Sequence, residues 1–155
     1  MASYTKQRPE YKENNDYYTP KWIFDKLGVQ FDLDVCAPCG GVSWIPATDH
    51  YCLDDDGLIQ DWRGLVWCNP PYSKPTPWID KFLEHGNGIM LTQVSKSNAF
   101  IRLWQESHAV MFLPRNTMFE HKDHGTKGIF MPVALFGMGH QATKAMVSSE
   151  INRVR

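Results

Sequence analysis

Short apolar segments that alternate with helical segments constrain the fold of this chain more than any other feature of its sequence. Continuous apolar runs of about five residues are typical of strands that are buried on both faces of a sheet. Segments of this kind lie at 31–35, 64–68, 88–94, 109–113 and 132–136. One weaker strand is expected near 48–53. Between several of these segments, apolar residues recur at the spacing of a helix. This alternation predicts an α/β fold with a mainly parallel sheet.

Hydroxyl residues, prolines and glycines indicate where the helices begin and end. Thr19-Pro20 and Thr76-Pro77 each combine a hydroxyl N-cap with a proline at the first helical position. Ser97 is the expected cap of a third helix, and Gly28 is expected to end the first.

The last third of the chain is less regular. Residues 115–128 are expected to form a loop or a hairpin, and residues 140–150 are weakly helical. Proline cannot donate a hydrogen bond within a sheet, so Pro132 predicts that the paired part of the last strand begins at or after Val133.

A length of 155 residues suits one domain with a substantial core. We expect a polar N-terminal arm at 1–17, a single domain at 18–150 and a basic tail at 151–155. No apolar run approaches a membrane-spanning length, and the polar start lacks the apolar core of a secretory signal, so a cytoplasmic protein is expected. A net charge of −1 excludes binding to nucleic acid by phosphate neutralisation alone.

Four cysteines raise the question of a metal site. Cys36 and Cys39 form a C-x-x-C motif, and His50 and Cys52 follow it, which is one possible zinc-ligand set. The second half lacks the closely spaced pair of common zinc modules, and Cys68 lies in an apolar strand. Disulfides are uncommon in proteins that are not exported. We therefore expect buried or loop thiols, with neither a metal nor a disulfide.

The loop Asn69-Pro70-Pro71-Tyr72 is the most informative motif, because it directly follows the apolar strand 64–68. The two prolines stiffen the loop and leave carbonyl acceptors without competing N–H donors. The Asn69 oxygen and the Pro70 carbonyl could together accept both hydrogens of one amino group, and Tyr72 supplies a flat ring for stacking. This combination suits a planar amine such as the exocyclic amine of a base.

The motif also carries a resemblance to a known family. NPPY after a buried strand resembles motif IV of amino-methyltransferases that use S-adenosylmethionine. The ordered strings YYTPKWIFDKL, FDLDVCA and DDGLIQDWRGLVWCNPPYS resemble the phage-type DNA adenine-N6 methyltransferases, the phage Dam family, over roughly residues 16–136. The resemblance implies a Rossmann-like methyltransferase fold of phage or prophage origin, whose mainly parallel sheet has an antiparallel last strand, in the cytoplasm of a bacterial host.

The resemblance further implies the catalytic roles. Asn69 and Pro70 would accept hydrogen bonds from the N6 amine of a flipped adenine, Pro71 would hold the loop, and Tyr72 would stack on the base. Two acceptors make the amine a better nucleophile, so no strong base is needed.

The cofactor residues follow from the same resemblance. Asp34 matches the acid of motif I, which binds the methionyl amine or the ribose of S-adenosylmethionine, and no metal is implied. The sequence departs from the fuller D-P-x-x-G-x-G pattern, with valine after Asp34. The other expected cofactor contacts are the neighbouring wall, the Thr-Pro turn, two candidate aromatic residues and two candidate acids, namely Cys36, Ala37, Thr19, Pro20, Tyr18, Trp22, Asp56 and Asp61.

DNA is the partner that the resemblance implies. Beside Tyr72, the residues expected to contact it are Ser73, Phe119 as a second stacking face, and the loop cations Arg115, Lys122 and Lys127. The small size of the chain and its lack of excess positive charge favour short or relaxed sequence specificity, or help from a second subunit in a homodimer.

Two alternatives remain open at this point. NPPY-type sites also methylate RNA adenines and a protein glutamine amide, because each presents a planar NH₂ group. The other alternative is a catalytically degenerate protein of the same fold that acts as a DNA-binding module, although the intact Asn69 and Tyr72 argue against it.

Overall fold

The main sheet of the computed structural model, which describes residues 17–121, 125–129 and 131–155, has six strands. In spatial order they are β3 (Ala47–His50), β2 (Phe31–Asp34), β4 (Val66–Cys68), β5 (Gly88–Gln93), β9 (Val133–Met138) and β6 (Ala109–Phe112). All strands run in the same direction except β9, which lies antiparallel between β5 and β6. The predicted α/β class, the antiparallel last strand and its start at Val133 are therefore confirmed.

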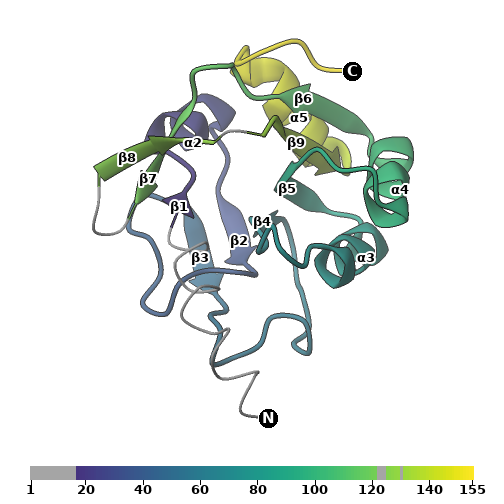
Figure 1. Ribbon diagram of the computed structural model, residues 1–155. Coiled ribbons are helices and arrows are strands. Elements are labelled where there is room, and N and C mark those ends of the chain that lie inside the picture. The colour runs from purple at the N-terminus through teal and green to yellow at the C-terminus, as the bar shows by residue number, and fades with distance from the viewer. Residues whose placement is uncertain (1–16, 122–124, 130) are drawn as a thin grey trace.

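Helices cover both faces of this sheet (Figure 1). Apolar residues of α2 (Lys21–Leu27) and α5 (His140–Ser149) share one core cluster, and those of α3 (Thr76–His85) and α4 (Asn98–Glu106) share the other. In β4, Trp67 belongs to the first cluster, and Val66 and Cys68 belong to the second. A central strand of a sheet with two covered faces has no polar side, which explains its continuous apolar sequence. Among the described residues no helix is long and apolar enough to cross a membrane.

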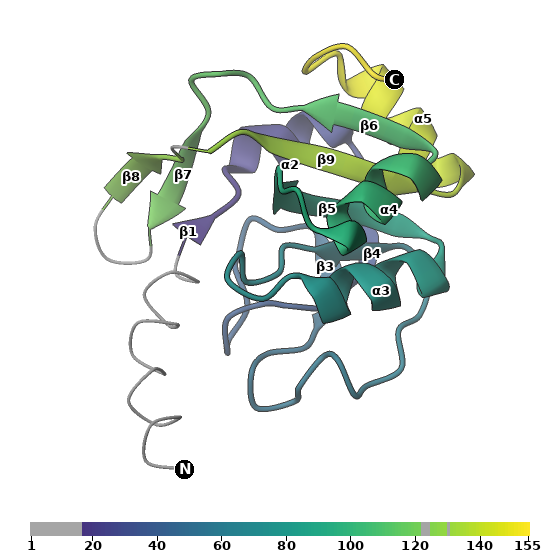
Figure 2. The same ribbon diagram turned by 45° about the vertical axis from the view of Figure 1, so that its right-hand side comes forward.

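A second, small sheet stands beside the main one (Figures 1 and 2). It consists of β1 (Tyr17–Tyr18), β7 (Met118–His121) and β8 (Gly125–Gly128), all paired antiparallel. A loop or a hairpin was expected for residues 115–128, and the protein therefore forms the hairpin. The strand β1 was not predicted, because two residues are too few for a periodic pattern.

The expected caps are correct for one helix and wrong for two. Ser97 accepts a 3.1 Å hydrogen bond from the backbone nitrogen of Phe100, as a capping serine does. In α2, however, Pro20 is the N-cap and Thr19 lies outside the helix. In α3, Thr76 is the first helical residue and forms no capping bond. The position of Thr19 matters below, because its hydroxyl is not used to cap a helix.

Candidate active site

A cavity of about 850 Å³ lies where the parallel strands of the main sheet end. Because β2 and β4 are adjacent and parallel, the loops that leave their carboxyl ends lie side by side. Residues of β1, β7 and β8 line the cavity opposite these loops. The residues proposed from the sequence that line it are Tyr18, Thr19, Asp34, Cys36, Ala37, Asp56, Asn69, Pro70, Pro71, Tyr72, Ser73, Phe119 and Lys127.

The Asn69–Tyr72 loop contributes an amide and an aromatic ring to the cavity. Pro70 and Pro71 are buried, and Asn69 and Tyr72 are half-buried. Within the described part of the chain, the side chain of Asn69 forms no hydrogen bond. Burial raises the pKa of the Tyr72 hydroxyl, so its ring is neutral at ordinary pH. The loop therefore presents a free amide oxygen next to an uncharged ring.

Asp34 is the buried acid of the cavity. It is the last residue of β2 and is only 3% exposed. Its Oδ1 accepts a 3.2 Å hydrogen bond from the backbone nitrogen of Cys36. Burial raises the pKa of this carboxyl from 3.8 to about 7, because the desolvation outweighs the hydrogen bond. A cationic or hydrogen-bond-donating ligand would favour the ionised form and would therefore bind to it strongly.

Thr19 provides a buried hydroxyl and lines the same cavity as Asp34. Its Oγ1 is buried and has no hydrogen-bond partner among the described residues. Its backbone carbonyl accepts a 2.9 Å hydrogen bond from Nε1 of Trp44, which holds the turn before α2 in place. A buried polar atom without a partner is costly, so this hydroxyl indicates a position at which a ligand supplies the missing hydrogen bond.

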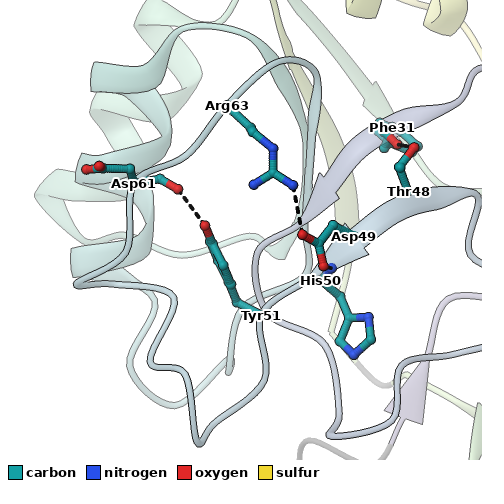
Figure 3. Close-up of polar contacts among 7 residues, drawn as sticks. All are labelled: Phe31, Thr48, Asp49, His50, Tyr51, Asp61 and Arg63. Atoms are coloured by element: carbon teal, nitrogen blue, oxygen red, sulfur yellow. Dashed lines mark hydrogen bonds and ion pairs between the residues drawn. The ribbon is translucent and has the colours of Figure 1, made fainter.

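The two candidate acids of the loop between β3 and β4, Asp56 and Asp61, differ in position. Asp56 lines the cavity, and its Oδ1 accepts a 3.1 Å hydrogen bond from the backbone nitrogen of Leu58. Asp61 does not line it. The Asp61 carbonyl accepts a 2.8 Å hydrogen bond from the Tyr51 hydroxyl, and its carboxylate points away from that ring (Figure 3). Nearby, Arg63 forms a 2.8 Å ion pair with Asp49 and so does not extend toward the cavity either (Figure 3).

Several other residues proposed from the sequence do not line the cavity. Trp22 is 39% exposed, because α2 turns Ile23, Phe24 and Leu27 toward the core and Trp22 away from it. Pro20 and Arg115 also lie outside the lining. Lys122 lies outside the described residues.

The cavity lining also includes residues that were not proposed from the sequence, among them Trp67, Trp78, Tyr17 and Gln93. Trp67 and Trp78 are buried in the core, and both also line the cavity. Tyr17 and Gln93 were not considered. Gln93 did carry a signal, because it is the polar end of an apolar strand whose carboxyl end faces the same edge as Asn69.

The expectation that the cysteines would not form a disulfide is wrong, because Cys39 and Cys52 form one, with their Cα atoms 4.8 Å apart. They belong to the loops that follow the parallel neighbours β2 and β3, an arrangement that the sequence spacing does not reveal. Asp54 lies beside the pair, with Oδ2 3.6 Å from Sγ of Cys39. Cys36 is a free thiol whose pKa is raised, first by burial and then by the nearby Asp34.

These features define an α/β protein with a ligand cavity at the carboxyl edge of its sheet, where a buried acid and an amide-bearing proline loop come together. Residues 7–118 match the family of DNA N-6-adenine-methyltransferases (Dam), and the chain belongs to this family. The chain is also 30% identical over 103 residues to the DNA N-6-adenine-methyltransferase of Haemophilus phage HP1 (strain HP1c1). That alignment covers 60% of this chain and 58% of the relative, so the chain spans somewhat more than half of the relative's length. The resemblance drawn from the sequence motifs is thereby confirmed.

Proposed function

We propose that this protein transfers a methyl group from S-adenosylmethionine to the N6 amine of adenine in DNA. The observation that carries the proposal is that one cavity contains both a buried acid, Asp34, and the amine-accepting loop that begins at Asn69. Membership of the Dam family, and the phage relative named a DNA N-6-adenine-methyltransferase, support this substrate and reaction.

The end of the cavity near Asp34 fits the cofactor. S-adenosylmethionine supplies an electrophilic methyl group on a sulfonium when it is bound. We assign its amine or hydroxyl donors to the Asp34 carboxylate, and one of its polar groups to the free Thr19 hydroxyl. Tyr18, Cys36, Ala37 and Asp56 line the same cavity. The volume of about 850 Å³ lies within the usual range for sites of small organic ligands.

The other end of the cavity fits a base. The free Asn69 oxygen and the Pro70 carbonyl would accept the two N6 hydrogens, which favours the pyramidal amine and exposes its lone pair to the methyl group. Tyr72 would stack on the ring, with Phe119 as a candidate for the second face, although Phe119 is buried in the main core. An adenine within a duplex cannot enter such a cavity, so the base must flip out of the helix.

The strand order is consistent with a Rossmann-like methyltransferase sheet. In this proposal β2 carries the cofactor acid, its parallel neighbour β4 carries the catalytic loop, and β9 is the antiparallel strand inserted beside β6. Placing the two loops on adjacent strands brings the donor and acceptor of the methyl group to one edge of the sheet.

DNA would approach the cavity over its rim. Ser73 and Lys127 are exposed lining residues, and Nζ of Lys127 lies 5.3 Å from the centroid of the Tyr17 ring. Arg115 is exposed on the turn before β7, where a duplex that spans the hairpin would meet it. With few cations available for phosphate contacts, a second copy of the chain could extend the DNA-binding surface as a homodimer.

Methyl transfer can be tested directly with the purified chain. Labelled S-adenosylmethionine is supplied with duplex DNA, RNA or protein, and the DNA is hydrolysed to identify N6-methyladenine. Label in RNA or protein but not in DNA would favour the alternative substrates, and cofactor binding without transfer to any of them would favour a DNA-binding module.

The role of Asn69 is tested by Asn69→Ala, which should lower transfer about a hundredfold or more and leave the cofactor dissociation constant nearly unchanged. Asn98→Ala is the matched control, because Asn98 is exposed at the start of α4 and does not line the cavity. Full activity of Asn69→Ala would refute the role.

A further inference from the structure

We propose that Gln93 helps the cavity to recognise the adenine ring, by donating a hydrogen bond from Nε2 to a ring nitrogen of the flipped base. This inference rests on the function proposed above and goes beyond it, since it concerns how the site recognises the ring and not only the amine.

The first argument is the position of Gln93 along β5. Side chains of a strand alternate between the two faces of a sheet, so Ile89, Leu91 and Gln93 share one face. Ile89 and Leu91 are fully buried in the core cluster that also contains Trp67. Gln93 is the half-buried last residue of this row and the only polar member. An apolar row that ends in an amide at the wall of a cavity presents that amide to whatever occupies the cavity.

The second argument is how far Gln93 lies, along the strand direction, beyond the end of the neighbouring strand β4. The last residue of β4, Cys68, pairs with Met90. β5 then continues for three more residues, to Gln93, while the chain after β4 becomes the Asn69–Tyr72 loop. At about 3.3 Å per residue, Gln93 lies roughly 10 Å beyond the end of β4, at the level of that loop. Gln93, Asn69 and Tyr72 line the same cavity.

The third argument is chemical. Within the described part of the chain, the side chain of Gln93 forms no hydrogen bond. Once Asn69 and Pro70 accept both N6 hydrogens, the ring nitrogens of adenine that flank the amine, N1 and N7, remain as acceptors. The amide nitrogen of a glutamine is a donor that suits such an acceptor, and a glutamine pairs with adenine edges elsewhere in DNA recognition.

The test compares wild type, Gln93→Ala and Gln93→Glu on duplexes whose target base is adenine, 1-deazaadenine or 7-deazaadenine. The cofactor dissociation constant of each variant is measured separately as a check on folding. We expect both variants to lower kcat/KM on adenine about tenfold to a hundredfold, because a buried acceptor loses its donor. We also expect the kcat/KM of wild type to be lower by a similar factor on one of the two deaza substrates than on adenine. On that same substrate, the kcat/KM of Gln93→Ala should equal its own value on adenine.

Two results would overturn the inference. Unchanged kcat/KM of Gln93→Ala on adenine would show that the contact is not made. The inference would also fail if each deaza substrate lowered kcat/KM, relative to adenine, by the same factor in wild type and in Gln93→Ala. That result would show that Gln93 does not act through a ring nitrogen. Failure of wild type to methylate adenine in any duplex is a different outcome, because it overturns the proposed function itself and this inference with it.

Discussion

An Asp34→Asn substitution should stabilise the protein without a ligand and weaken its binding of S-adenosylmethionine, the proposed cofactor. The pKa of the Asp34 carboxyl rises from 3.8 to about 7 on folding because the group is buried. Between these two pH values, the folded protein keeps a proton that the unfolded chain has already released. The contribution of this protonated carboxyl to the unfolding free energy is full below pH 3.8 and is lost as the pH rises through about 7. The full loss corresponds to at most about 4 kcal/mol. Asparagine has the same shape and no such loss.

The assay is urea unfolding of wild type and Asp34→Asn at several pH values between 4 and 8. The difference in unfolding free energy between the two proteins should grow in favour of Asp34→Asn as the pH rises, and it should level off above pH 7. Asp25→Asn is the control for the removal of a carboxylate, since Asp25 is exposed on α2. Parallel curves for wild type and Asp34→Asn would refute the argument that burial perturbs this carboxyl.

Calorimetric titration with S-adenosylmethionine supplies the second half of this test. Losing a charge-assisted hydrogen bond should weaken binding by roughly tenfold to a hundredfold in Asp34→Asn. In wild type, affinity should fall as the pH drops below about 7, because the ligand must then compete with a proton for the carboxylate. An affinity that is independent of pH and unchanged in Asp34→Asn would show that the cofactor does not contact this acid.

Three further predictions concern stability. The Cys39–Cys52 disulfide closes a loop with a sequence separation of 13, so a reductant should lower the unfolding free energy by about 3 kcal/mol, and it should have no effect on a variant with serine at both positions. Gly57→Ala would place a Cβ 2.1 Å from the backbone oxygen of Val35, so urea unfolding should show a loss of about 1–3 kcal/mol, whereas Gly128→Ala, whose Cβ would meet Sδ of Met118 at an ordinary contact distance of 3.8 Å, should be nearly neutral. Ser97→Ala removes the cap of α4 and should cost about 1 kcal/mol in the same assay; a cost near zero would contradict the capping role.

The order and type of the main elements could be read from local patterns. Apolar runs marked the strands of the main sheet, and Gly28 marked the end of α2 in a left-handed conformation that glycine adopts without strain. The start of β9 followed from the missing donor of Pro132. The error at Thr19 has an equally local cause: a threonine before a proline matches a helix start, and nothing in the sequence distinguishes a capping hydroxyl from one that is buried in a cavity wall.

The candidate site was only partly predictable. Asp34 and the Asn69–Tyr72 loop could be identified because Asp34 ends one strand and the loop directly follows another, and motif resemblance suggested roles for them. Trp22 and Asp61 were proposed for the cavity but do not line it, because the side to which a residue points depends on how its helix or loop packs.

By itself, the sequence determined the α/β fold class and the family, since these depend on residue types at short spacing. Only the tertiary structure decided which distant residues share the cavity. The adjacency of β2, β4 and β5 brings Asp34, Asn69 and Gln93 to one edge, and the adjacency of β2 and β3 brings together Cys39 and Cys52. Strand pairing depends on contacts between residues far apart in the chain, and such contacts leave no periodic trace in any one segment.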